Sequence, residues 1–352
     1  MTGQVVRLDR RSLVWRAGVA SVRFRARTAG ACVVLVALVV LIAVVALGLG
    51  SFQVSAPDVV RALFGQGPQA IQTLVVKWRL SRVVLALLIG VALGASGAVF
   101  QSLTRNPLGS PDIVGFSSGA YAGAVVAIIL VDLNQASVVT GALIGGLLTA
   151  AAVYLLAYRQ GVQGFRLIVV GIAVTAMLGS ATTYLLVHTD LWRAQLAAIW
   201  GAGSINGMDW DEVRAIGVLL LVSLPAVLLL SRRLSILELG HDAAAGLGVR
   251  VEAVRLGLVL FGVALIAVPS ALAGPIQFVA LASPHIARAL TRGTGALVVP
   301  SALVGAFLMI GCDVIAQHLF APMILPVGLV TIVLGGGYLT WLIARQTRRE
   351  LR

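Results

Sequence analysis

The chain has 352 residues, of which 59% are hydrophobic and 11% are charged, and its formal net charge is +13. Soluble domains are about 45–50% apolar and about 25% charged, so this composition excludes an ordinary soluble protein and indicates an integral membrane protein. The charge would suggest nucleic-acid binding in a soluble protein, but in a membrane protein it reflects which loops carry the arginines. Lys77 is the single lysine and follows no glycine-rich loop, so the chain has no P-loop for ATP.

Apolar segments of spanning length follow one another along the chain. A membrane-spanning helix needs about 20 apolar residues. On this criterion the predicted spans are residues 29–50, 79–103, 113–131, 135–158, 167–188, 213–230, 253–268, 276–290, 296–319 and 326–344. They predict an all-α, polytopic membrane domain of about ten transmembrane helices at residues 29–344. Small residues four positions apart, Gly90 and Gly94 or Gly141 and Gly145, predict close contacts between helices.

The distribution of arginine predicts the orientation of these spans. Arginine is concentrated in residues 1–28, in alternate loops and in residues 345–352. The positive-inside rule assigns such segments to the cytoplasm. An even number of spans places both arginine-rich tails on that side, so we predict that both termini are cytoplasmic.

A polar segment at about residues 232–252 separates the sixth and seventh predicted spans. It is longer than a simple connection between two helices requires. Gly240 and Gly248 flank the sequence HDAAAGL, which is long enough for about two helical turns, and glycine commonly ends helices. The segment is either a solvated linker or a short helix that a soluble cytoplasmic partner binds.

Few residues support catalysis or metal binding. The four histidines are scattered and show no metal-binding spacing. A G-x-S-x-G match at residues 115–119 opens a predicted span, whereas a nucleophile elbow follows a strand of a soluble sheet. Asp313 lies within a predicted span, where we expect a buried structural hydrogen bond rather than a proton relay. We therefore expect no catalytic residue and no metal site.

Two arginines stand at the outer end of the second predicted span, against the positive-inside trend. Arg79 and Arg82 are three positions apart, which places them on one face of a helix. One interpretation is contact with lipid at the interface. The other is a docking patch that pairs with acidic residues of a partner outside the cell membrane.

Short motifs distributed over nearly the whole chain carry a resemblance to a known family. They are RLSR at 79–82, SGAVFQ at 96–101, RNPLGSPD at 105–112, GFSSG at 115–119, LGHDAAAGLGV at 239–249, GPIQFV at 274–279, PHIAR at 284–288 and LPVG at 325–328. In combination they resemble the permease family of iron–siderophore, haem and vitamin B12 ABC importers. Each motif alone is weak, and the combination is specific.

The resemblance implies a fold, a function and a set of partners. The fold is that of a type II ABC importer permease with ten spans, in the plasma (inner) membrane of a bacterium. The implied partners are a second permease subunit, two cytoplasmic ATPase subunits and a substrate-binding protein or lipoprotein outside. ATP and Mg would bind to the ATPase subunits, so this chain would bind no cofactor itself and would not be an enzyme. Its function would be to couple ATP hydrolysis to alternating access for ferric siderophores or related metal chelates.

The resemblance also implies roles for particular residues. Arg79 and Arg82 match arginines that dock the binding protein, and Asn106 matches a position at the cytoplasmic gate. Gly164 and Phe165 stand where the family often carries Ser or Thr at that gate.

Two further sets of residues are implied. Ser117 and Ser118 match a region near the translocation pathway. The segment at residues 239–249 matches the helix that docks in the ATPase cleft. The expected coupling residues are Glu238, Leu239, Gly240, His241, Asp242, Leu247 and Gly248.

The sequence departs from the family at a few positions and leaves alternatives open. Gln317 and His318 stand where a basic docking residue is common, and Ile324 stands where an acid is common. These departures fit one half of a heterodimer, although a homodimer and the identity of the chelate stay open. A secondary transporter driven by an ion gradient would need coupling groups at mid-membrane, where Asp313 is the only candidate. An enzyme acting on lipid would need convergent polar groups that the sequence lacks.

Overall fold

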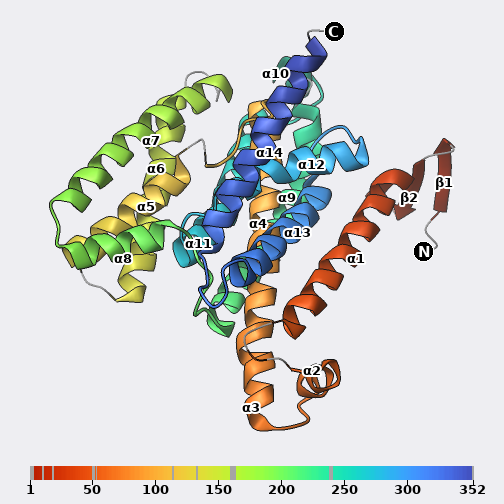
Figure 1. The fold of residues 1–352 in the computed structure, drawn as a ribbon. Coiled ribbons are helices and arrows are strands. Elements are labelled where there is room, and N and C mark those ends of the chain that lie inside the picture. The colour runs from red at the N-terminus through yellow and green to blue at the C-terminus, as the bar shows by residue number, and fades with distance from the viewer. Residues whose placement is uncertain are drawn as a thin grey trace.

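The computed structural model describes residues 4–350 except residues 10–11, 18–19, 50–51, 53, 113–114, 132–133, 159–163 and 238–240. Three short strands come first, β1 (Gln4–Asp9), β2 (Ser12–Ala17) and β3 (Ala20–Arg25), and they form an antiparallel sheet in the order β1-β2-β3. These strands lie in the arginine-rich tail, where no sheet is predicted from the sequence. The described chain after them consists of helices and their connections (Figure 1).

Each predicted span has a corresponding helix. The helices are α1 (Ala26–Gly48), α4 (Ser81–Thr104), α5 (Phe116–Val126) continued by η2 (Ala127–Val131), α6 (Gln135–Ala157), α7 (Gly164–Val187), α9 (Trp210–Leu237), α11 (Val251–Ala273), α12 (Val279–Thr291), α13 (Val298–His318) and α14 (Val327–Glu350). Among the described residues, seven helical stretches are long and apolar enough to cross a membrane, and residues 116–131 and 327–341 form shorter apolar helices. α12, a helix of 13 residues, is the tenth helix that corresponds to a predicted span. The prediction of an all-α membrane protein with about ten spanning helices is confirmed.

Shorter helices connect the spans. α2 (Ala56–Leu63), α3 (Gln69–Gln72) and η1 (Thr73–Leu80) lie between α1 and α4, α8 (Leu191–Gly201) lies before α9, and α10 (His241–Gly246) lies before α11. α8 begins after Asp190, whose carboxylate accepts a hydrogen bond from Arg193 N at 3.0 Å. α10 and the C-terminal end of α14 lie at one end of the bundle, and α2 and α3 lie at the other (Figure 1).

The second spanning helix is longer than its predicted span. α3, η1 and α4 form one continuous helix of 36 residues over positions 69–104. At about 1.5 Å per residue it measures about 54 Å, whereas the hydrocarbon core of a bilayer is about 30 Å thick. Its first turns therefore project beyond the membrane, beside α2 in Figure 1. Hydrophobicity does not predict this extension because residues 69–80 include Gln69, Gln72 and Lys77.

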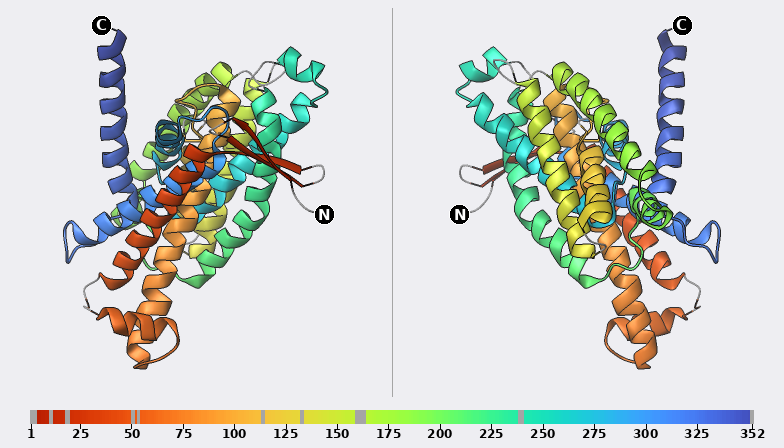
Figure 2. Two further views of the ribbon diagram at one scale, coloured as in Figure 1. Left: turned by 90° about the vertical axis from the view of Figure 1, so that its right-hand side faces the viewer. Right: turned by 90° about the vertical axis from the view of Figure 1, so that its left-hand side faces the viewer.

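The last helix packs against α12 and α13 near its N-terminal end. Figure 2 shows that the C-terminal half of α14 extends clear of the bundle. Val333 and Trp341 on this helix are 72% and 53% exposed. An apolar surface of this kind in a membrane protein contacts lipid or another subunit.

α4 and α13 approach so closely that their backbones touch. A Cβ atom on Gly90 would lie 2.4 Å from Gly305 O, and a Cβ atom on Gly305 would lie 2.1 Å from Gly90 O. A Cβ atom on Gly94 would lie 2.2 Å from Ser301 O. The close contact predicted from the first pair of small residues is confirmed, and the second pair, on α6, lies against α5 in the same way.

An ion pair closes the outer end of the contact between α4 and α13. Arg82 Nη2 lies 2.7 Å from Asp313 Oδ1, and Arg82 Nε lies 3.0 Å from Asp313 Oδ2. Gln317 Nε2 donates a further hydrogen bond to Asp313 Oδ2 at 2.8 Å. The side chains of Arg82 and Asp313 are only 15% and 2% exposed. The expected buried hydrogen bond of Asp313 is confirmed, and its principal partner is an arginine.

We predict that Gly305→Ala destabilises the protein by about 1–3 kcal/mol, because the added methyl group forces two backbones apart. Gly311→Ala is the matched control on the same helix, since a Cβ atom there meets no atom within 4 Å. Thermal unfolding in detergent measures both variants. Equal melting temperatures for the two would contradict the close contact.

We predict that Asp313→Asn destabilises the protein by about 3–5 kcal/mol, because Arg82 is then left charged and unpaired in a buried position. The double variant Arg82→Gln/Asp313→Asn should recover part of this loss, since no charge remains unpaired. Asp211→Asn is the control, because its ion pair with Arg214 is exposed and contributes about 1 kcal/mol at most. A loss no larger than that of the control would show that the buried pair is not structural.

Candidate functional site

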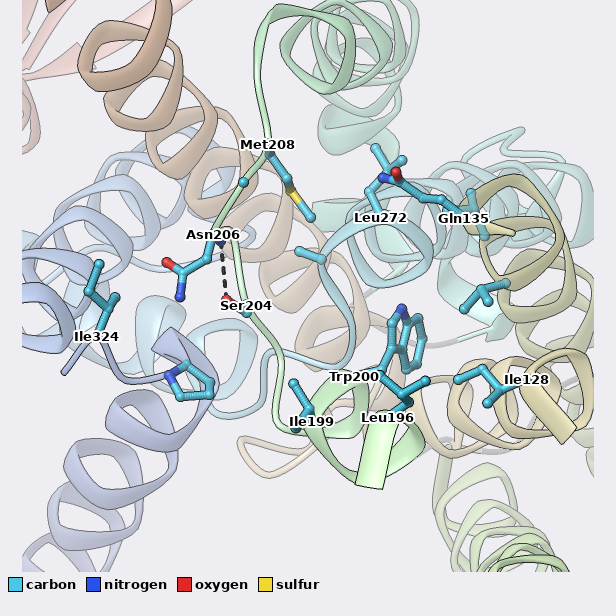
Figure 3. A pocket seen from close by; sticks show the side chains of 15 residues that line it. Ile128, Gln135, Leu196, Ile199, Trp200, Ser204, Asn206, Met208, Leu272 and Ile324 are labelled. Atoms are coloured by element: carbon cyan, nitrogen blue, oxygen red, sulfur yellow. Dashed lines mark hydrogen bonds between the residues drawn. The ribbon is translucent and has the colours of Figure 1, made fainter. Parts of the chain in front are cut away.

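A cavity of about 670 Å³ lies among the ends of the helices that are predicted to face outside. Figure 3 shows Leu196 and Trp200 of α8 along one side, with Met208 of the connection between α8 and α9 across from them. The polar side chains of its lining are Gln135, Ser204 and Asn206, and none of its lining residues is charged. The cavity, called here the outer pocket, therefore suits an apolar group that carries a few hydrogen-bonding atoms.

Two backbone hydrogen bonds and one close backbone approach hold one side of the outer pocket in place. Ser204 N donates to Ala273 O at 2.7 Å, which ties the α8–α9 connection to the end of α11. Gly328 N donates to Gly203 O at 2.9 Å, which ties the same connection to the start of α14. Gly203 has a φ of +70° and a Cβ atom there would lie 2.4 Å from Pro275 O, so only glycine fits.

α8 is also fixed from the side of α5. The rings of Trp200 and Tyr121 are stacked with their centroids 6.3 Å apart and an interplanar angle of 5°. A stacked aromatic pair stabilises a contact beyond the area that it buries. The outer pocket is thus a preformed cavity whose walls come from five separate parts of the chain.

The two outer arginines make internal contacts. Arg79 Nη1 donates to Leu47 O at 2.9 Å, and its Nη2 donates to Phe52 O, so Arg79 holds the end of α1 against η1. Arg82 is bound to Asp313. Their role in docking a partner stays a prediction. A carboxylate of a partner could bind Arg82 only by sharing or displacing the carboxylate of Asp313.

Asn106 shapes the loop between α4 and α5. Its side-chain oxygen accepts a hydrogen bond from Leu108 N at 2.9 Å, and its carbonyl oxygen accepts one from Gly109 N at 2.9 Å. Pro107 O lies 2.9 Å from His285 Nε2 of α12. These bonds give the loop one compact conformation, and Leu108 at its tip is 45% exposed. The gate role of Asn106 stays a prediction that this geometry is compatible with.

Ser117 is buried at the start of α5. Its hydroxyl donates to Asp112 Oδ1 at 2.5 Å, and Asp112 Oδ2 is enclosed without a hydrogen-bond partner among the described residues. Burial raises the pKa of Asp112 to about 6, although the hydrogen bond from Ser117 acts in the opposite direction. Ser117 is only 4% exposed and Ser118 is half-buried. The hydroxyl of Ser117 therefore serves the contact with Asp112 in this conformation, and the predicted contact with the pathway is untested.

Gly164 and Phe165 form the second predicted gate position, and the side chain of Phe165 is exposed. Gly164 is the first residue of α7, and the Phe165 side chain that follows it is 79% exposed. A large apolar side chain with this exposure at the end of a spanning helix is free to close a passage or to contact a second subunit. The gate role of both residues stays a prediction.

The short helix predicted in the polar segment is present as α10. α10 ends at Gly246, and the turn after it is closed by hydrogen bonds from Leu247 N to Ala243 O at 3.1 Å and from Gly248 N to Ala245 O at 2.9 Å, with Gly248 at a φ of +77°. Ala244 is buried, whereas Leu247 is 66% exposed. The predicted coupling residues Glu238, Leu239 and Gly240, and the side chains of His241 and Asp242, lie outside the described residues.

The end of α9 is hydrogen-bonded to the loop that contains Asn106. Arg105, at the start of that loop, donates from Nη2 to the carbonyl oxygen of Leu237, the last residue of α9. A displacement of the end of α9 would therefore act on the loop through this hydrogen bond.

Some of these features have no signal in the sequence. The pairing of Arg82 with Asp313 joins residues 231 positions apart. The outer pocket depends on how five segments pack. The general rule that a charge buried in a membrane protein needs an opposite charge is the one signal that would have linked Asp313 to an arginine at similar depth.

The comparisons with known proteins agree with this arrangement. Residues 35–345 match the FecCD transport family. The chain is 44% identical over 319 residues to the ferric enterobactin transport system permease protein of Escherichia coli (strain K12), covering 91% of this chain and 97% of the relative. It is 36% identical over 282 residues to the hemin transport system permease protein of Yersinia pestis, covering 78% and 83%.

A solved structure has the same fold. A metal-chelate type ABC transporter in an inward-facing conformation superposes with a TM-score of 0.81 and 28% sequence identity, covering 90% of this chain and 99% of the other. The family match extends over most of the chain, including the outer pocket, the Asn106 loop and α10. The chain therefore belongs to the FecCD transport family.

Proposed function

We propose that the chain is the membrane-spanning permease subunit of an ATP-driven importer of ferric siderophores or related metal chelates. The observation that carries this proposal is α10, a separate short helix between two spans, with Leu247 exposed, in a chain that has no P-loop. Such a chain cannot hydrolyse ATP by a P-loop and presents a contact site for a protein that does. The names of its relatives, which include transport permeases for ferric enterobactin and hemin, support the cargo class.

The proposed mechanism transmits motion from the cytoplasm to the pathway. Closure of two ATPase subunits on ATP and Mg displaces α10, and α9 moves with it. The hydrogen bond from Arg105 to Leu237 O passes this displacement to the loop with Asn106. The passage thereby changes the side to which it opens, as in other alternating-access transitions. No cofactor binds to this chain in the proposed mechanism.

The proposed passage binds cargo weakly. The lining of the outer pocket carries no charge, and its polar groups are neutral amides and a hydroxyl. A metal chelate already has its metal ligands satisfied, so it needs no ligand from the protein. Affinity and selectivity would reside in a binding protein outside, which would dock near Arg79 and the projecting turns of α3 and η1.

The remaining partners follow from the surfaces that the chain leaves open. A second permease subunit, identical or homologous, would cover apolar faces such as that of α14, where Val333 and Trp341 are exposed. Both termini would lie in the cytoplasm of a bacterium, with the chain in its inner membrane. Gln317 binds Asp313 instead of offering a positive charge, which fits a heterodimer whose other half supplies that charge.

A secondary transporter is the alternative, and one contact opposes it. Such a transporter needs an ionisable group that can exchange a proton or bind an ion near mid-membrane. Asp313 is the candidate within a span, and its carboxylate is bound to Arg82 and Gln317. Both carboxylate oxygens of Asp313 are therefore engaged by side chains of the protein itself.

We predict that membrane vesicles containing the assembled importer take up ferric siderophore only while ATP is supplied. Collapse of the proton and sodium gradients should leave uptake unchanged, because the proposed mechanism uses no ion coupling. Uptake of a radioactive iron chelate with and without ionophores measures this. Uptake that persists without ATP and stops with ionophores would favour the secondary transporter instead.

We predict that Leu247→Ser uncouples ATP hydrolysis from uptake. Loss of a central apolar contact weakens a protein interface by about 1–2 kcal/mol, so docking of the ATPase subunits should weaken by about tenfold. Leu290→Ser is the control, because Leu290 is an exposed leucine on the same side of the membrane but on α12. Coupled uptake at the level of the control would mean that α10 is a passive linker.

A further inference from the structure

The helix that corresponds to the eighth predicted span is too short to cross the membrane. α12 has 13 residues, so at about 1.5 Å per residue it measures about 20 Å, whereas the hydrocarbon core is about 30 Å thick. Residues 274–278, between α11 and α12, are not helical. Two of them, Gly274 and Phe278, have a left-handed backbone with φ values of +73° and +67°. This stretch, called here the 274–278 segment, therefore carries the chain from the end of α11 into the depth of the membrane.

A contact with α14 fixes the depth of the inner end of this segment. A Cβ atom on Gly335 would lie 2.2 Å from the Cβ atom of Phe278, so the Phe278 side chain packs directly on the backbone of α14. Gly335 stands at the middle of the predicted span 326–344. Gln277 is the residue before Phe278 and therefore lies near the middle of the membrane.

The other end of the segment is joined to the outer pocket. A Cβ atom on Gly203 would lie 2.4 Å from Pro275 O, so the segment starts against the connection between α8 and α9. Leu272 and Ala273, directly before the segment, belong to the lining of the outer pocket. The chain thus runs from the wall of the pocket to mid-membrane within a few residues, and Gln277 lies on the inner side of the pocket.

The side chain of Gln277 is exposed, in contrast to its neighbours. Ile276 is 2% exposed and Phe278 is half-buried. The backbone carbonyl oxygen of Gln277 accepts a hydrogen bond from Val279 N at 2.9 Å. Its side-chain amide makes no hydrogen bond with any residue that the structure describes. An exposed polar group thus stands at mid-membrane without a partner in the described part of the chain.

Exposed hydroxyl groups on the spanning helices are bonded differently. Ser180 and Thr183 of α7 and Thr340 of α14 each donate to the carbonyl oxygen four positions earlier, at 3.0, 2.9 and 2.9 Å. Their polar groups are satisfied within their own helix, so these side chains can face lipid at little cost. Gln277 lies outside a helix and has no such acceptor.

An amide without a partner is costly in hydrocarbon, because its lost hydrogen bonds to water are not replaced. Gln277 therefore needs water, cargo or another subunit beside it. A water-filled passage supplies the first two, and the continuity with the outer pocket places Gln277 on the way inward. We propose that Gln277 lines the passage and forms a hydrogen bond with the metal chelate as it crosses, an inference that rests on the proposed import function.

The chemistry of the amide suits this cargo. A glutamine side chain offers two donor hydrogens and an acceptor oxygen. The oxygen-rich surface of a ferric chelate accepts hydrogen bonds from such a group without giving up a metal ligand. A contact at mid-membrane replaces part of the hydration that the chelate loses there. It should therefore act on the maximal rate of uptake, whereas the half-saturating concentration is set by the binding protein outside.

The experiment compares variants of the assembled importer in membrane vesicles supplied with ATP and loaded binding protein. The probes are an anionic tris-catecholate and a neutral tris-hydroxamate chelate of radioactive iron. Gln277→Leu should lower the maximal rate by about fivefold at an unchanged half-saturating concentration, because one hydrogen bond to the cargo is lost. Its melting temperature in detergent should not fall, since no described residue loses a partner.

Two further variants sharpen the test. Gln277→Glu keeps the size and adds a negative charge, so it should slow the anionic chelate more than the neutral one, because like charges repel strongly in a medium of low dielectric constant. Thr340→Val is the matched control, since it also replaces an exposed polar group by an apolar one of similar size. The hydroxyl of Thr340 is already bonded to Gly336 O, so this variant should transport as the unmodified importer does.

Two results would overturn the role of Gln277. One is equal maximal rates for Gln277→Leu and Thr340→Val. The other is release of the second permease subunit from Gln277→Leu in native mass spectrometry, which would assign the amide to a contact between subunits. An unmodified importer without ATP-driven uptake would overturn the proposed function as well. Normal uptake by the unmodified importer together with either of the first two results overturns this inference alone.

Discussion

The carboxylate of Asp313 is held by Arg82 within the protein interior, and this ion pair constrains the way in which the molecule can move. Separating the pair would leave two charges unpaired in a buried setting, which costs several kcal/mol. The backbone contact between Gly90 and Gly305 lies on the same two helices and leaves no room for a Cβ atom at either position. α4 and α13 therefore behave as one rigid body. Any change of access must come from helices with fewer contacts, of which α14 is the clearest, since its C-terminal half stands apart in Figure 2.

Charge is distributed unevenly between the two ends of the proposed passage. The outer pocket is lined by neutral side chains, whereas the inner face carries the guanidinium groups of Arg105 and Arg288. In the proposed passage a neutral outer cavity would release a chelate easily, because no charge would have to be desolvated or separated. Positive charge on the inner face agrees with the positive-inside rule.

Local patterns in the sequence predict local features of this fold well. Hydrophobic segments predict the spanning helices, the pair Gly90 and Gly94 predicts a close helix contact, and Gly248 predicts the end of α10. The patterns fail where the cause is tertiary. Arg82 is predicted to contact lipid or to dock a partner together with Arg79, yet its partner in the structure, Asp313, is 231 positions away and no periodicity connects the two. The extension of α4 beyond the membrane is missed because a helix in water needs no apolar run.

The hydrogen bond between the end of α9 and the Asn106 loop depends on a backbone acceptor. Arg105 binds the carbonyl oxygen of Leu237, which is the last residue of α9, and such an atom moves with the helix end whatever side chains surround it. The donor is the guanidinium group of a long side chain, which can rotate and absorb part of a displacement. In the proposed mechanism, only a displacement of α9 that exceeds the reach of this side chain moves the loop.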